Sequence, residues 1–150
     1  MKYKVCSFFG HKTILSKVEA ELLQHIRHAI ETLNVQEFYV GEYGAFDFLA
    51  KKCVVECRKE FPHIKLYLAL AYMPTKNTLI GKDYDGSIFF DGLESGPKRF
   101  AITKRNRIIA KESDVIICYV EKKSGGAYTA VNHAKNQGKL ILNCVDNEIF

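Results

Sequence analysis

The stretch VIICYVEKKSGGAYTA, residues 115–130, predicts a strand, a glycine turn and a helix in immediate succession. Val115–Val120 is a short apolar run typical of a buried strand. Ser124-Gly125-Gly126 supplies the turn, and the helix runs over Ala127–Gln137 until Gly138 ends it as a C-cap glycine. A strand that passes through a tight turn into a helix of this length is typical of a βαβ unit.

Short apolar runs alternate with amphipathic segments along the rest of the chain as well. Further strands are expected at Tyr3–Phe9, Glu37–Val40, Ile64–Ala71 and Leu140–Cys144. Helices are expected from about Ser16, where Ser16-Lys17-Val18-Glu19 fits a capping box, at about Ala45–Phe61 and at Lys98–Glu112. The run Ile64–Ala71 is nearly all apolar, which predicts burial on both faces. The pattern predicts one α/β domain over residues 1–150, a Rossmann-like three-layer sandwich with a mostly parallel sheet flanked by helices.

The segment at about 73–97 does not follow this pattern, and we expect a long irregular insertion there. It contains four of the 10 glycines and two of the 3 prolines. Within it, Ser87–Phe90 is strand-like and predicts an edge strand or a small hairpin. A connection of this length is either a functional element, such as a lid over a site, or a decorated crossover without a catalytic role.

The composition excludes several classes of protein. With 47% hydrophobic and 26% charged residues, the chain is neither disordered, collagen-like nor a disulfide scaffold. No run approaches the ~20 apolar residues of a membrane span, and no signal segment is evident, so we expect a cytoplasmic protein. Five cysteines, an odd number, are expected to be reduced core residues, and no metal or cofactor site is predicted. The net charge of +5 is compatible with a phosphate-bearing ligand.

Candidate ligand-binding residues follow three of the predicted strands, where ligands bind in open parallel sheets. They are Gly10, His11, Lys12, Gly41, Glu42, Gly44, Asp47, Ser124, Gly125, Gly126 and Thr129. The turn at Gly125-Gly126 would aim backbone N–H groups and a helix dipole at an anion, although a merely flexible turn gives the same pattern. His11 could contact a phosphate or transfer a proton.

Arg105 lies on the apolar face of its predicted helix, where an unpaired guanidinium is costly. Its partner could be Glu42, Asp47 or an anionic ligand bound bidentately, or its head could reach water past the core. Either carboxylate could hold a ribose hydroxyl, act in the cleavage of an N-glycosidic bond or pair with Arg105. Asp47 could equally be a first-turn charge that favours its predicted helix.

In their order along the chain, these motifs resemble the SLOG superfamily, in particular its small stand-alone bacterial and phage-type branch. The resemblance rests on Phe9-Gly10-His11-Lys12, Gly41-Glu42-Tyr43-Gly44-Ala45-Phe46-Asp47, Arg105-Asn106-Arg107 with Ser113-Asp114, and Ser124-Gly125-Gly126-Ala127-Tyr128-Thr129-Ala130. The superfamily includes lonely-guy phosphoribohydrolases, the Rossmann-like part of DNA-processing protein A and nucleotide sensors. The resemblance covers Lys4 to Val145 and implies a homodimer that binds a nucleotide-type ligand, such as an ADP-ribose-like molecule, with Arg105 and Gly125-Gly126 near its phosphates. Asn106, beside Arg105, is a further candidate ligand-binding residue.

The sequence departs from the lonely-guy enzymes at the position of their catalytic glutamate, where it has Asn132. An amide cannot act as a carboxylate base, which puts that hydrolysis in doubt. Tyr128 replaces a glycine of the motif, and Asn106 replaces its lysine. Three hypotheses follow: a protein that senses or sequesters a nucleotide, an N-glycosidase that uses Glu42 or Asp47, and a nucleic-acid-binding module with Lys104, Arg107 and Lys111 on one helical face.

Overall fold

The computed structural model describes residues 3–11, 17–42, 44–70, 81–89, 100–145 and 149–150. Its elements are β1 (Val5–Gly10), α1 (Glu19–Glu31), β2 (Glu37–Val40), α2 (Ala45–Arg58), β3 (Lys65–Leu70), β4 (Gly86–Phe89), α3 (Ala101–Glu112), β5 (Val115–Tyr119), α4 (Gly125–Asn136) and β6 (Leu140–Asn143). The six strands form one sheet in the order β4-β3-β2-β1-β5-β6, and all five pairings are parallel. The predicted Rossmann-like α/β fold is confirmed.

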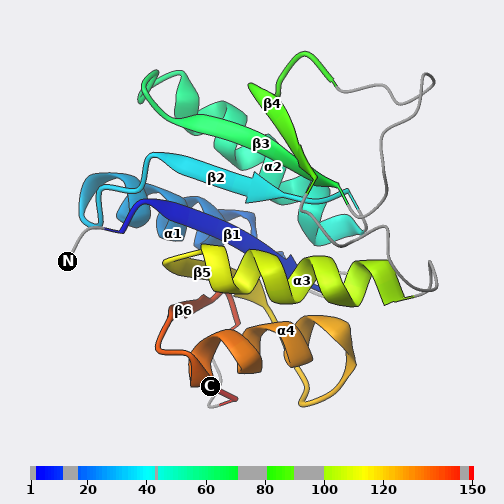
Figure 1. Cartoon of the computed structure of the whole chain (residues 1–150). Helices are drawn as coiled ribbons and strands as arrows, with labels where there is room; N and C mark the ends of the chain where they lie inside the picture. The colour runs from blue at the N-terminus through cyan, green and yellow to red at the C-terminus, as the bar shows by residue number, and fades with distance from the viewer. Residues whose placement is uncertain (1–2, 12–16, 43, 71–80, 90–99, 146–148) are drawn as a thin grey trace.

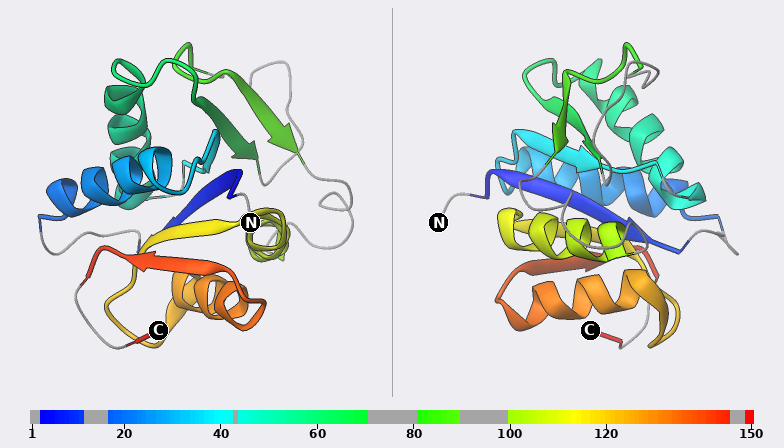
Figure 2. Two further views of the ribbon diagram at one scale, coloured as in Figure 1. Left: turned by 90° about the vertical axis from the view of Figure 1, so that its left-hand side faces the viewer. Right: turned by 45° about the vertical axis from the view of Figure 1, so that its right-hand side comes forward.

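Helices cover both faces of the sheet, with α1 and α2 on one face and α3 and α4 on the other (Figures 1 and 2). The chain moves outward from β1 through β2, β3 and β4, then returns to β5 beside β1 and continues outward to β6. The direction of winding therefore reverses between β1 and β5. In a sheet of this kind the carboxyl ends of the two strands at the reversal border a crevice that ligands use.

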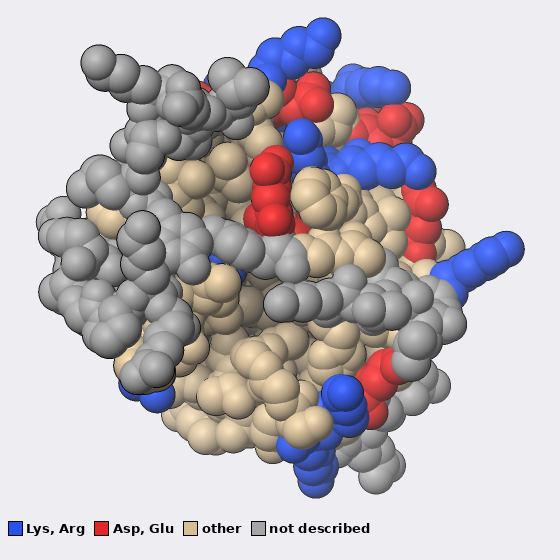
Figure 3. Space-filling model, turned by 90° about the vertical axis from the view of Figure 1, so that its right-hand side faces the viewer, with Lys and Arg blue, Asp and Glu red and all other residues tan. Residues whose placement is uncertain are grey.

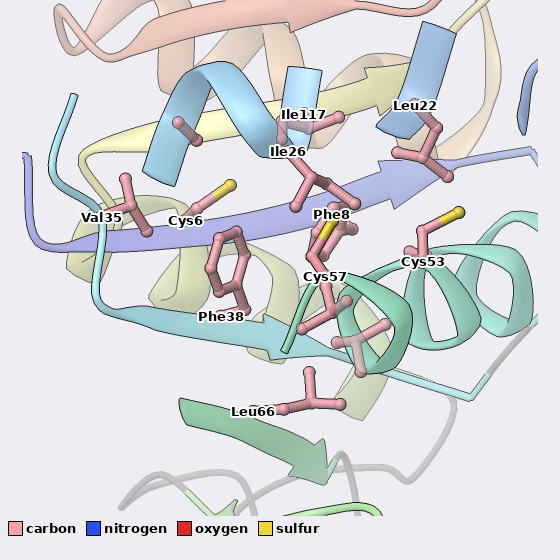
Figure 4. Packing of buried hydrophobic residues seen from close by; sticks show 14 of the residues in the cluster. Cys6, Phe8, Leu22, Ile26, Val35, Phe38, Cys53, Cys57, Leu66 and Ile117 are labelled. Atoms are coloured by element: carbon pink, nitrogen blue, oxygen red, sulfur yellow. The ribbon is translucent and has the colours of Figure 1, made fainter. Parts of the chain in front are cut away.

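Side chains that alternate along the central strands fill two cores, one on each face. On β1, Cys6 and Phe8 point into the layer beneath α1 and α2, where Figure 4 shows them against Leu22 and Ile26, while Phe9 belongs to the opposite layer. All five residues of β5 are buried. Strands that lie between two helix layers have no face left for water, which explains their continuous apolar runs.

The five cysteines are free and buried, as expected for core residues. Burial raises the pKa of the Cys53 and Cys144 thiols to about 12. Thiols with so high a pKa are poor nucleophiles and poor metal ligands at neutral pH.

Some boundaries differ from the prediction. Helix α1 begins at Glu19, not at Ser16, which lies outside the described residues, and Val18 occupies the N-cap position without a capping side chain. Val18 has a non-helical backbone and a side chain buried in the core. Helix α2 ends at Arg58, short of Phe61. Burial on both faces is also wrong for Lys65, which is exposed at the start of β3.

The irregular segment contributes one element that the structure describes. The strand expected at Ser87–Phe90 is present as β4, which among the described residues is a parallel edge strand beside β3. Residues 71–80 and 90–99 lie outside the described part of the chain, so the lid remains a prediction. Among the described residues, no helix has both the length and the apolar character that crossing a membrane requires.

Candidate ligand-binding site

A pocket of about 180 Å³ lies at the carboxyl ends of the strands where the winding reverses. We call it the switch-point pocket. Its walls come from the end of β1 and from residues of α2, α3 and α4, and its lining consists of Phe8, Phe9, Gly10, His11, Asp47, Ile102, Arg105, Asn106, Gly126 and Ala127. Figure 3 looks onto this end of the molecule, where uncharged surface separates groups of charged side chains.

The pocket brings together about half of the residues singled out from the sequence. Gly10, His11, Asp47, Arg105, Asn106 and Gly126 line it. Gly41, Glu42, Gly44, Ser124, Gly125 and Thr129 are outside its lining, and Lys12 lies outside the described residues. Phe8, Phe9, Ile102 and Ala127 line it without having been singled out. They are apolar neighbours of the candidate residues, so the sequence marks them as core and not as part of a site.

Arg105 is buried, with 5% of its surface exposed, although it carries a permanent charge. Its Nη1 donates a hydrogen bond of 3.2 Å to the backbone carbonyl of Ala69 on β3. Its Nη2 and Nε donate to Oδ1 of Asn106 at 2.8 and 3.3 Å. The alternative in which the guanidinium reaches bulk water is therefore wrong. The charge is held at the wall of the pocket, where an anion would gain most from it.

Asn106 has a defined orientation because a guanidinium can only donate hydrogen bonds. Its amide oxygen must face Arg105, so its NH₂ group is the part that it can present to a ligand. The side chain is thus a hydrogen-bond donor in the pocket. A donor beside a buried guanidinium suits an acceptor-rich group such as a phosphate.

The N-terminus of α4 forms another wall. Ser124 is the N-cap residue, but no side chain among the described residues caps the first N–H groups of this helix. Gly125 has a φ of +93°, a conformation that favours glycine, and a Cβ at Gly126 would have no atom within 4 Å. Thr129 directs its hydroxyl back to the carbonyl of Gly125 at 2.9 Å. Open N–H groups and the helix dipole make this end attractive to an anion.

His11 is fixed as a neutral imidazole. Its backbone N–H donates to the carbonyl of Tyr119, and its Nε2 accepts a hydrogen bond of 3.1 Å from the backbone N–H of Glu121. Burial and, to a smaller extent, the positive charge of Lys122 lower the pKa of His11. Because Nε2 accepts, the ring proton resides on Nδ1. His11 therefore enters the pocket as a neutral group and not as a cation.

Glu42 lies outside the lining of the pocket, in a cluster with Tyr84 and Lys51. Its Oε1 accepts a hydrogen bond of 2.6 Å from the hydroxyl of Tyr84 and lies 3.9 Å from Nζ of Lys51. The same ammonium lies 4.7 Å from the centre of the Tyr84 ring. Burial and the hydrogen bond to Glu42 raise the pKa of Tyr84. Among the described residues that line the switch-point pocket, Asp47 is the carboxylate.

Fold and site together define a Rossmann-like protein with a pocket at the switch point of a parallel sheet, in which Arg105, Asn106 and Asp47 stand among apolar residues. Solved structures that share this fold include two of DNA-processing protein A. The chain from Streptococcus pneumoniae matches with a TM-score of 0.64 at 18% identity, over 94% of this chain and 50% of that chain. The chain from Helicobacter pylori, whose structure describes a single-stranded DNA binding mode, matches with a TM-score of 0.61 at 13% identity, over 95% of this chain and 65% of that chain.

The present chain thus spans half of the first of these proteins and about two thirds of the second. No protein-family profile matches its sequence, and no curated protein matches it either. The expected resemblance to the Rossmann-like part of DNA-processing protein A is confirmed at the level of the fold.

Proposed function

We propose that the protein binds a nucleotide-derived small molecule and holds its phosphate in the switch-point pocket, as a sensor or a sequestering protein would. The strongest support is that Arg105, Asn106 and the N-terminus of α4, which no described side chain caps, converge on one pocket. Each of them offers hydrogen-bond donors, and the guanidinium adds a full charge in a sheltered place. Donors of this kind recognise phosphate oxygens.

Asp47 adds a negatively charged hydrogen-bond acceptor to the pocket. It stands in the first turn of α2 and lines the same pocket as Arg105. A carboxylate repels a phosphate but accepts hydrogen bonds from hydroxyl groups. A ligand that satisfies both residues carries a phosphate and a sugar, which is the chemistry of a nucleotide, and an ADP-ribose-like molecule fits this description.

An N-glycosidase is the second candidate, and Asp47 rather than Glu42 would serve it. Asp47 lines the pocket, whereas Glu42 lies outside its lining. Asn132, at the position of the lonely-guy glutamate, is half-buried on α4 and offers no carboxylate. Binding explains the pocket without a catalytic group, so we place it first.

A nucleic-acid-binding module is the third candidate, favoured by the fold shared with the Helicobacter pylori protein. Arg107 and Lys111 are exposed on α3, and Lys104 is half-buried there. These three positive charges lie along a single short helix. Binding to the phosphate backbone of DNA needs several such contacts and depends steeply on the salt concentration, so we place this candidate third. The homodimer that the resemblance implies stays a prediction.

Calorimetric titrations with adenosine 5′-monophosphate, adenosine and ribose 5-phosphate test the proposal. We expect both phosphorylated compounds to bind and adenosine to bind much more weakly, because it lacks the group that Arg105 recognises. At 100 times its dissociation constant, a ligand also adds about 2.7 kcal/mol to the stability of the protein. Equal binding of adenosine and its monophosphate would contradict the proposal. Release of free adenine during the titration would favour the glycosidase instead.

A further inference from the structure

A second pocket, of about 170 Å³, lies in the groove between α3 and α4. Its lining consists of Thr103, Asn106, Arg107, Gly126, Thr129, Ala130 and His133. Two of these residues, Asn106 and Gly126, also line the switch-point pocket. The two pockets therefore adjoin across the N-terminal end of α4, and one ligand can occupy both.

The groove arises from the spacing of residues along the two helices. Thr103 and Arg107 are four positions apart on α3, and Gly126, Ala130 and His133 repeat at helical spacing on α4, so each set shares one face. Gly126 has no side chain and Ala130 is small and buried, which leaves space between the helices. In this lining, Arg107 is exposed and His133 is half-buried.

We propose that this groove holds the nucleobase of the ligand whose phosphate occupies the switch-point pocket. The inference rests on the proposed function, which assigns a place to the phosphate of the ligand but none to its base. The planar guanidinium of Arg107 and the imidazole of His133 are groups on which a base stacks, and such stacking tolerates every base because each has a π-face.

The polar groups of the groove complement the edge of a base. Thr129 uses its hydroxyl proton in the bond to the carbonyl of Gly125, so its oxygen can only accept from a ligand. Asn106 uses its oxygen for Arg105, so its NH₂ group can only donate. A base offers both an acceptor and a donor along its edge, whereas a second phosphate would offer acceptors alone.

The sizes of the pockets agree with this division. Neither pocket reaches the ~300–1,000 Å³ typical of a complete small-molecule site, and each is large enough for only part of a ligand. Together they reach the lower end of that range. A sugar phosphate in one pocket and a single ring system in the other would use both.

Paired titrations of ribose 5-phosphate and adenosine 5′-monophosphate measure what the base contributes. We expect the monophosphate to bind about 5- to 150-fold more tightly, the range that stacking of one base provides. In the His133→Ala and Arg107→Ala variants this advantage should shrink severalfold while the affinity for ribose 5-phosphate stays as it is. Lys111→Ala, which removes an exposed charge one turn further along α3, is the matched control and should retain the advantage.

The outcomes separate the two proposals. If ribose 5-phosphate binds and the base adds nothing, or if His133→Ala weakens both compounds equally, the base subsite is wrong and phosphate binding stands. If neither compound binds the wild-type protein, both proposals fail. A parallel titration with a short single-stranded oligonucleotide distinguishes a free nucleotide from a base within a nucleic acid. If the oligonucleotide binds more tightly than the monophosphate and His133→Ala abolishes this difference, the groove holds a base of a nucleic-acid strand.

Discussion

Gly10, the last residue of β1, packs directly against Phe46 in the first turn of α2. A Cβ at position 10 would lie 2.6 Å from the Cβ of Phe46 and closer still to its ring. Only a glycine permits this approach, which sets the start of α2 against the end of β1. Asp47, the next residue of the helix, thereby lines the same pocket as Gly10. The glycine is therefore required for packing as well as for access to a ligand.

Gly10→Ala should destabilise the protein by about 1–3 kcal/mol, the usual cost of an added methyl group in a packed core. The Phe46 ring is fully buried and cannot swing out into water. Urea unfolding of the wild type and the variant measures the difference. An unchanged midpoint would show that the start of α2 shifts freely, and the described packing would then be wrong.

Gly126→Ala should behave in the opposite way. Since a Cβ at this position meets no atom within 4 Å, stability should be unchanged or slightly raised, because alanine is a better helix former than glycine. The methyl group would instead project at the lining of both pockets. We expect the affinity for ribose 5-phosphate to fall about tenfold, which corresponds to ~1.4 kcal/mol. Full affinity in this variant would place the phosphate elsewhere.

Stability should depend on pH through His11. Its pKa is lowered in the folded protein, chiefly by burial, below the ordinary value of 6.5. The unfolded chain therefore takes up this proton first as the pH falls. The stabilisation is complete above about pH 6.5 and is lost as the pH drops from there through the folded-state pKa. Urea unfolding at a series of pH values between about 7 and 5 should show the loss.

His11→Gln isolates the contribution of this group. Its amide oxygen can still accept the hydrogen bond from the N–H of Glu121, but it does not titrate. The decline between about pH 7 and 5 should be shallower in the variant than in the wild type. Identical pH profiles would mean that His11 is not the group responsible.

Asp47→Asn should strengthen the binding of inorganic phosphate, because it removes a negative charge from the pocket. The repulsion between two such charges in a water-like medium is ~1 kcal/mol, which corresponds to a gain in affinity of about fivefold or more. The affinity for ribose 5-phosphate should gain less, since the variant also loses an acceptor for the sugar hydroxyls. Glu42→Gln is the control, because Glu42 is bound to Tyr84 and is not part of the lining. Equal effects of the two substitutions on phosphate would contradict the assignment of Asp47.

Most of the fold is predictable because its strands lie between two helix layers and are therefore continuous apolar runs. Val115–Tyr119 is the clearest example: all five of its residues are apolar and buried. The start of α1 is not predictable in this way. Ser16-Lys17-Val18-Glu19 has the residues of a capping box, but the helix begins at Glu19, and Val18, whose side chain is buried, occupies the N-cap position.

The site is predictable where the topology decides it. Gly10 ends β1 and Gly126 follows β5, the two strands at the winding reversal, and Asp47 follows β2, the neighbour of β1. Because these strands are parallel, their carboxyl ends lie at one edge of the sheet, and the three residues line one pocket there. Glu42 follows a strand too, yet its hydrogen bond joins it to Tyr84, 42 positions along the chain in a segment without periodicity. No local pattern predicts such a pairing. Arg107 likewise reads as part of a solvated basic face, because its groove exists only once α3 packs against α4.

The central claim is that Arg105 holds a phosphate, and calorimetric titration of ribose 5-phosphate into the wild type, Arg105→Ala and Lys111→Ala tests it most directly. We expect Arg105→Ala to lose about 10- to 100-fold in affinity, the range for charge-assisted hydrogen bonds, while Lys111→Ala binds like the wild type. Circular dichroism confirms that each variant is folded, and Arg105→Lys, which keeps the charge but not the planar fork, should bind with intermediate affinity. A folded Arg105→Ala protein with the wild-type dissociation constant would contradict the account.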